Sequence, residues 1–168
     1  MRVFRATTIP ALLYGSETWT LLQADSNRLE VFQMRCLRRI LGVSLRDKLK
    51  NDIIRTRCER QPTIEDQIRQ RRLRWFGHVC RMPQHRLPNR ALFHRRPATW
   101  KIQKKAARKI WQMQVAADLA TSRLNIAEAR EKAQDRRAWR QLTTAGPQQQ
   151  RAPTAAYWLR GQPRPAAS

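Results

Sequence analysis

Histidine and cysteine side chains near the middle of the chain raise the question of a metal site. His78, Cys80, His85 and His94 lie close together in the sequence, and imidazole and thiolate are ligands that zinc favours. Residues two apart on a helix point to different sides, however, and no C-x2-C or H-x3-H pair is present to anchor a tetrahedral site. The spacing therefore predicts no metal site and no cofactor.

The residue types also give no support for catalytic chemistry. Cys36, Cys58 and Cys80 have no close partner for a disulfide or a CxxC redox motif. Free cysteine is usually a small buried hydrophobic residue, so we expect no catalytic residue among them. Unpaired thiols indicate a reducing compartment, and the opening apolar stretch is too interrupted for a secretory signal. We expect an intracellular protein, nuclear or cytoplasmic, that is not secreted.

Arginines beside aromatic residues form the arrangement that points to binding. In "RRLRWFGHVCRM", residues 71–82, a helical period places four basic residues on one stripe. This basic stripe consists of Arg71, Arg74, His78 and Arg81. A planar guanidinium can meet phosphate oxygens with two hydrogen bonds, whatever the base sequence. We therefore predict that the basic stripe contacts nucleic-acid phosphates, with a solvated charged face as the alternative.

The overall charge favours an anionic partner. Thirty-five Lys and Arg stand against 12 Asp and Glu, which gives a formal net charge of +23. Residues 67–117 hold fourteen basic residues and no acidic one. Phosphates are dense, and binding them releases condensed counterions, so RNA, DNA or an RNA:DNA hybrid is the predicted partner. A cationic module on an anionic membrane surface is a lesser alternative.

Further basic residues extend the predicted contact surface before and after the basic stripe. Some lie on the basic side of an expected helix that ends near Leu41, and the others lie between residues 95 and 109. These residues are Arg35, Arg39, Arg95, Arg96, Lys104, Lys105, Arg108 and Lys109. Trp100, within the same basic stretch, is the candidate for stacking on bases.

Hydrophobic periodicity predicts an all-α fold, with four to six helices in a small and strongly basic module. Helices are expected over 3–15 with an interruption at Pro10, over about 25–41, within 44–60, and over 63–82, 103–119 and 125–142. Their expected caps are Asp25 or Ser26, Asn51, Thr63 and Asn125, with Gly15 and Gly42 as stops. Three prolines indicate an extended or loop conformation for residues 83–99.

Composition divides the chain into four predicted regions. These are a thumb-like helical region at 1–82, a basic Pro-containing linker at 83–102, a C-terminal basic helical pair at 103–142, and a disordered tail at 143–168. The tail is assigned to disorder because it is rich in Pro, Gln, Ala and Arg.

The helical period also predicts which side chains pack inside. The expected packing face of the 63–82 helix is Ile64, Ile68, Trp75 and Val79, with Phe76 at its flank. The expected apolar face of the 25–41 helix is Leu29, Phe32, Cys36, Leu37, Ile40 and Leu41. Gly77 costs a helix about 1 kcal/mol relative to alanine, which indicates a close-packed neighbour. Arg69 and Arg72 fall near the apolar arc, and we expect one of them to pair with Glu17.

Several blocks resemble a known family. "LLYGSETWTL", "LEVFQMRCLRRILGV", "RQPTIEDQIRQRRLRWFGHVCRM", "LPNRALF" and "AQDRRAWRQL" are similar, in order and spacing, to the region just C-terminal to the reverse transcriptase palm in LINE-type (non-LTR) retrotransposon polyproteins. The resemblance covers residues 3 to about 142. It implies a thumb and post-thumb segment that holds template and primer, with the palm domain as a further partner.

The departures from that family bear on activity. The Tyr-x-Asp-Asp turn that holds two catalytic metals in that family is absent from these 168 residues, no Asp-Asp pair occurs in them, and we expect the family's endonuclease domain to be missing too. "KKAARKIW" stands where relatives have a Gly-Arg-Pro turn. We therefore expect a truncated, non-catalytic fragment of an RNA-directed DNA polymerase. A remnant reading frame without an independent stable fold is the alternative.

Overall fold

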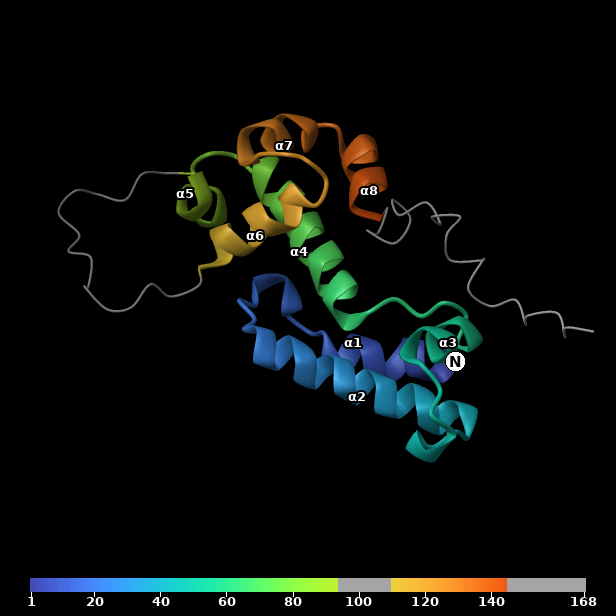
Figure 1. Cartoon of the computed structure of the whole chain (residues 1–168). Coiled ribbons are helices and arrows are strands. Elements are labelled where there is room, and N and C mark those ends of the chain that lie inside the picture. Colours follow the sequence, from blue (N-terminus) through green and yellow to red (C-terminus); the bar gives the residue numbers. More distant parts are fainter. Residues whose placement is uncertain (94–109, 145–168) are drawn as a thin grey trace, which may run out of the picture.

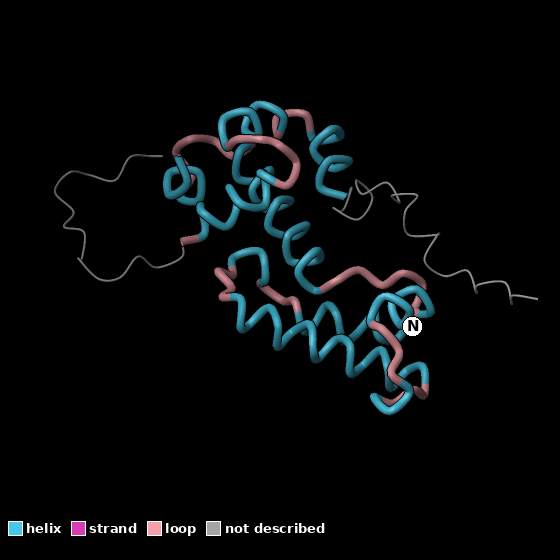
Figure 2. The backbone as a smooth tube through the Cα atoms, in the orientation of Figure 1, coloured by secondary structure: helices cyan, strands magenta, loops and turns pink. Residues whose placement is uncertain are grey.

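The computed structural model describes residues 1–93 and 110–144, and every regular element within these ranges is helical (Figure 1, Figure 2). This confirms the all-α class, although these ranges contain eight α-helices rather than the expected four to six. Thr143 and Thr144 belong to the last helix, and the rest of the expected disordered tail lies outside the described residues. Within them, no helix is long and apolar enough to cross a bilayer.

The N-terminal segment is helical in three short pieces. These are the π-helix η1 (Phe4–Thr8), the α-helix α1 (Ile9–Leu12) and the 3-10 helix η2 (Ser16–Thr18). The expected interruption at Pro10 is wrong, because the backbone stays helical through it: the π-helix η1 leads directly into α1, and Pro10 stands where the one changes to the other. The stop at Gly15 is confirmed, since its φ of 68° lies in the left-handed region that glycine adopts easily.

Helix α2 (Gln23–Leu41) is followed by η3 (Leu45–Asp47) and α3 (Asn51–Arg57). Gly42 ends α2 as expected, with a left-handed φ of 67°. The caps predicted for α2 and α3 are wrong. Helix α2 begins before Asp25, and Asn51 is the first residue of α3 while its side chain accepts a hydrogen bond from Arg38 at 2.7 Å. A short polar residue near a helix start can bond elsewhere, so its presence does not fix the boundary.

Helix α4 (Ile64–Cys80) begins as predicted, with Thr63 Oγ1 accepting from the amide of Asp66 at 3.0 Å. Side chains from later elements cap its other end. Asn89 Nδ2 donates to the carbonyl oxygens of Val79 and Met82 at 3.0 and 3.1 Å. The last carbonyls of a helix have no partner within it, so the fully buried Asn89 supplies one.

Three predictions for the second half of the chain need correction or restriction. Helix α5 (Leu87–Phe93) occupies part of the expected loop, because Pro88 stands in its first turn, where proline is tolerated. The expected helix from 103 is described only from residue 110, as α6 (Trp111–Ala120). The single helix expected over 125–142 is two helices, α7 (Ile126–Lys132) and α8 (Arg136–Thr144). Asp135 Oδ1 accepts from the amides of Arg137 and Ala138, and this cap starts a new helix.

Two hydrophobic clusters form the core, and α4 belongs to both. The N-terminal cluster is Phe4, Ile9, Leu13, Met34, Leu37, Ile54, Cys58, Ile64 and Ile68. The C-terminal cluster is Leu73, Phe76, Cys80, Val115, Leu119, Ala129, Ala133 and Trp139. Figure 1 shows α4 running from the group formed by α1, α2 and α3 to the group formed by α5 to α8. The helix therefore joins the two halves of the described chain.

The change of partner along α4 explains where the predicted packing face fails. Ile64, Ile68 and Val79 are buried as expected. Trp75 is only half-buried and belongs to neither cluster, whereas Phe76 is fully buried in the C-terminal cluster. The buried side of the helix rotates between its two ends, so one straight stripe cannot describe it.

The expected apolar face of α2 is also partly wrong. Leu37 is buried and Leu29, Cys36 and Leu41 pack against the N-terminal cluster, but Phe32 and Ile40 are 41% and 44% exposed. The buried side includes Gln33, whose Nε2 donates to the carbonyl of Pro62 at 2.9 Å. This polar contact, 29 residues away in sequence, turns α2 from the orientation that hydrophobicity alone predicts.

Candidate nucleic-acid interface

The basic stripe on α4 contains two side chains that face solvent. Arg74 and His78 are exposed, and neither makes an ion pair or hydrogen bond through its side chain within the described residues. The imidazole of His78 lies beside the indole of Trp75, with ring centroids 5.4 Å apart. Arg74 therefore presents an uncompensated cation on the outward side of the helix, where a phosphate could approach.

The other two members of the stripe hold the fold together. Arg71 Nη1 donates to the carbonyl of Leu13 at 3.0 Å, and Arg81 Nη1 donates to the carbonyl of Ala133 at 2.6 Å. Both arginines are half-buried. Arg71 thus ties the middle of α4 to the N-terminal half of the described chain, and Arg81 ties its C-terminal end to the C-terminal half. Only their remaining N–H groups are left for a phosphate.

The two buried arginines of α4, Arg69 and Arg72, bind side chains of the C-terminal half. Arg72 Nη1 donates to Asp118 Oδ2 at 2.9 Å, and Arg69 Nη1 donates to Thr121 Oγ1 at 2.8 Å. Burial lowers the pKa of Arg72, and the Asp118 carboxylate opposes that shift. The predicted pairing with Glu17 is wrong. The backbone carbonyl of Glu17 instead accepts from Trp111 Nε1 at 2.8 Å.

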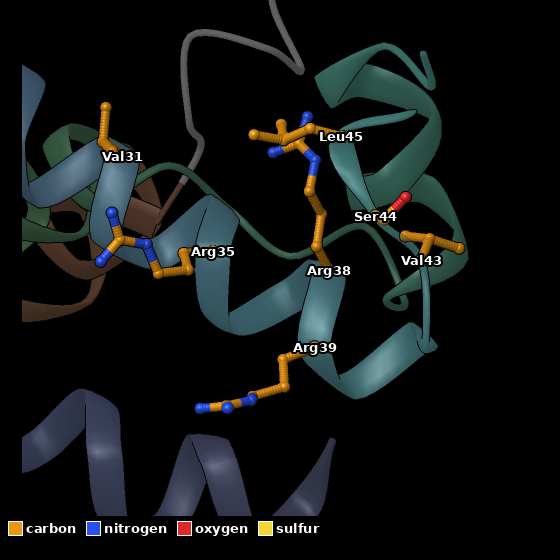
Figure 3. Close-up of a pocket in the computed structure, with 7 residues that line it drawn as sticks. All are labelled: Val31, Arg35, Arg38, Arg39, Val43, Ser44 and Leu45. Atoms are coloured by element: carbon orange, nitrogen blue, oxygen red, sulfur yellow. The ribbon is translucent and has the colours of Figure 1, made fainter. Parts of the chain in front are cut away.

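Two predicted contact residues on α2 also face solvent. Arg35 and Arg39 are exposed and have no side-chain hydrogen bond or ion pair within the described residues. Both project from α2 in Figure 3. Their neighbour Arg38 is held by Asn51 and by the carbonyl of Leu49. The predicted residues Arg95, Arg96, Trp100, Lys104, Lys105, Arg108 and Lys109 lie outside the described residues, so their roles stay predictions.

Helix α8 carries basic side chains that sequence reasoning missed. Arg136, Arg137 and Arg140 are exposed, while Trp139 and Thr143 face inward. A helical period applied to "DRRAWRQL" places Arg136, Arg137 and Arg140 on one arc with Trp139 outside it, so this signal was present in the sequence. With Arg74 on α4 and Arg35 and Arg39 on α2, these residues place exposed guanidinium groups on three helices.

The titratable side chains of the described part do not assemble a metal site. No group of three His, Cys, Asp or Glu within residues 1–93 and 110–144 is placed to hold a metal ion. Burial raises the pKa of the Cys80 thiol to about 11, and it also raises the pKa of Cys58. Both thiols therefore stay protonated near neutral pH, as the unreactive side chains of a core do.

Comparison with curated proteins finds a distant relative of this chain. The chain is 31% identical over 104 residues to an uncharacterized transposon-derived protein of Caenorhabditis elegans. The match covers 60% of this chain and 37% of that protein. No protein-family model and no solved structure matches the chain. The chain is thus a distant homologue of a transposon-derived protein, and it spans a little over a third of that relative's length.

Proposed function

We propose that the chain is a non-catalytic nucleic-acid-binding segment of a LINE-type retrotransposon reverse transcriptase. It would correspond to the thumb and post-thumb region, and would hold RNA, DNA or an RNA:DNA hybrid through phosphates. Homology to a transposon-derived protein supports the origin, and the quoted sequence blocks support the more specific assignment. In this proposal the polymerase chemistry belongs to the palm domain, which is then a natural partner.

The observation that carries the binding proposal is the set of unpaired, exposed cations. Arg35, Arg39 and Arg74 have no acidic partner within the described residues, although arginines elsewhere in the fold pair with Glu30, Glu59 and Asp118. With a net charge of +23, acidic groups are scarce, and only four of the 12 Asp and Glu form an ion pair with an arginine within the described residues. Phosphates are the anions that such a surface would attract, because each contact releases condensed counterions.

Binding of a labelled RNA strand at rising salt tests this function. Neutralising several phosphates makes log K fall linearly with log salt, with a slope of about 0.7 per contact on a single strand. Arg74→Gln should lower the affinity for RNA. It should also reduce the magnitude of that slope by less than about one, because a single phosphate contact is lost. Arg57→Gln is the matched control. Arg57 is exposed on α3, so this substitution removes the same charge at a site away from the basic stripe.

Two results would contradict the proposal. One is an RNA affinity that stays flat between about 50 and 200 mM salt. The other is an equal loss for Arg74→Gln and Arg57→Gln, because the attraction would then come from net charge alone and not from a defined surface. Replacing the RNA by vesicles of anionic lipid addresses the membrane alternative in the same assay.

A further inference from the structure

The end of α2 and the segment after it form a pocket of about 500 Å³. Figure 3 shows Val31, Arg35, Arg38 and Arg39 along the helix, with Val43 and Leu45 on the segment that follows. Aliphatic and guanidinium groups thus line the same depression, and no acidic residue is among the lining side chains. This α2 pocket is separate from the basic stripe on α4.

The aliphatic side chains of the α2 pocket are open to solvent. Val31 is 59% exposed and Leu45 is 78% exposed. A single exposed aliphatic residue needs no explanation, but these two share one depression, and Phe32 is also partly exposed beside Val31. Phosphate contacts would leave these carbon atoms in water, so nucleic-acid binding does not account for them.

The charged groups of the α2 pocket differ in how firmly they are held. Arg38 is fixed by its hydrogen bonds to Asn51 Oδ1 and the carbonyl of Leu49. Arg35 and Arg39 are free to pair within the described structure. Asp47, the acid of the following turn, is already bound by the amide and hydroxyl of Ser44 at 2.6 and 3.1 Å. The pocket therefore offers two uncompensated cations beside an apolar floor.

We propose that the α2 pocket docks an acidic, amphipathic helical segment of a partner protein. Apolar side chains at helical spacing on that segment cover Val31 and Leu45, and carboxylates beside them pair with Arg35 and Arg39 through charge-assisted hydrogen bonds. A second copy of this chain is a poor occupant, because each copy carries a net charge of +23 and the two repel. This docking goes beyond the proposed nucleic-acid function: it shares Arg35 and Arg39 with that function, whereas Val31 and Leu45 belong to the docking alone.

The test uses the full chain and a synthetic amphipathic helix. The probe carries leucine at i, i+3, i+4 and i+7 and glutamate on its flanks, and a scrambled peptide of equal composition and charge is the control. Fluorescence anisotropy should show at least about tenfold tighter binding of the amphipathic peptide. The double substitution Val31→Ser/Leu45→Ser should remove this preference. Leu22→Ser, at an equally exposed aliphatic residue outside the pocket, should keep it.

A second variant tests the charged groups. Arg35→Gln/Arg39→Gln should weaken the amphipathic peptide at least about fivefold, and Arg74→Gln, on the other surface, should weaken it less. Thermal melts of all variants should match the wild type, because every substituted side chain is exposed.

Two outcomes would overturn the docking proposal. In the first, the two peptides bind equally, or Val31→Ser/Leu45→Ser retains the preference, so that attraction is by charge alone. In the second, that uncharged double substitution lowers RNA affinity instead, which would make the pocket a nucleic-acid site. Neither outcome alters the salt dependence measured with Arg74→Gln, so failure of this proposal is distinguishable from failure of the proposed function.

Discussion

The indole of Trp139 lies against the backbone of Gly77, so closely that a Cβ on residue 77 would stand 2.1 Å from Nε1. The same indole nitrogen donates to the carbonyl of Leu73 at 3.0 Å, one turn earlier on α4. The close neighbour expected for Gly77 is therefore confirmed, and it comes from α8. The glycine allows α8 to approach α4 and bury its tryptophan in the C-terminal cluster.

Gly77→Ala should destabilise the fold, although alanine is the better helix former by about 1 kcal/mol. A methyl group at this distance displaces the ring, and overpacking of this kind costs about 1–3 kcal/mol. Urea unfolding measures the change. In a Trp139→Leu background the penalty should shrink or reverse, because the obstructing ring is gone. A stabilising Gly77→Ala in the wild-type chain would show that the indole does not sit there.

The local part of this arrangement was predictable, and the long-range part was not. Thr63 and Gly42 mark helix ends through contacts within a few residues, and a single sequence contains that information. The rotation of the buried side along α4 arises because the helix leaves one cluster and enters another, which no local period records. Hence a single helical period predicts Trp75 in the core and Phe76 at the flank, whereas Phe76 is fully buried and Trp75 only half-buried.

The same limit applies to ion pairs. That an arginine on α4 needed a carboxylate was predictable from its place near the apolar arc. Its partner, Asp118, is 46 residues away. Side-chain chemistry alone does not distinguish Glu17, the predicted partner, from Asp118. Of the candidate interface, the residue types were predictable, while the anchoring of Arg71 and Arg81 to carbonyl groups required the tertiary structure.

The buried pair of Arg72 and Asp118 predicts a large cost for removing one partner. Asp118→Ala leaves the guanidinium buried without its carboxylate, and the loss should be about 3–5 kcal/mol. Replacing both residues by apolar ones, as Arg72→Met/Asp118→Leu, should recover most of that loss. Urea midpoints at unchanged m-value provide the measurement. If the double variant is as unstable as the sum of the single ones, the two side chains are not coupled.

Because the Cys80 thiol is buried, we expect the free energy of unfolding to fall at alkaline pH. Burial raises its pKa from 9.0 to about 11, so above pH 9 the unfolded chain releases the thiol proton before the folded chain does. The resulting stability is complete below pH 9 and is lost as the pH rises toward about 11. Comparing thermal melts of the wild type and Cys80→Ala over this range isolates the effect. Parallel curves for the two proteins would contradict it.

Arg71 and Arg74 predict opposite phenotypes for the same substitution. Arg71→Gln removes the hydrogen bond to Leu13 and should cost about 1–2 kcal/mol of stability. Arg74→Gln removes no hydrogen bond or ion pair within the described fold and should change stability by less than about 0.5 kcal/mol, while lowering RNA affinity. Chemical denaturation and RNA binding on both variants check this. Similar stabilities for the two would show that Arg71 is not an anchor.

The sharing of α4 between the two clusters has a consequence for hydrogen exchange. Backbone amides at 68–73, between the last contact with one cluster and the first with the other, can open only when both halves of the described fold have lost their support. They should therefore be the most slowly exchanging amides, with protection close to the global free energy of unfolding. Amides of α3 and α7, which serve one half each, should exchange through smaller openings. A helix rich in arginine would then set the longest exchange lifetime in the molecule.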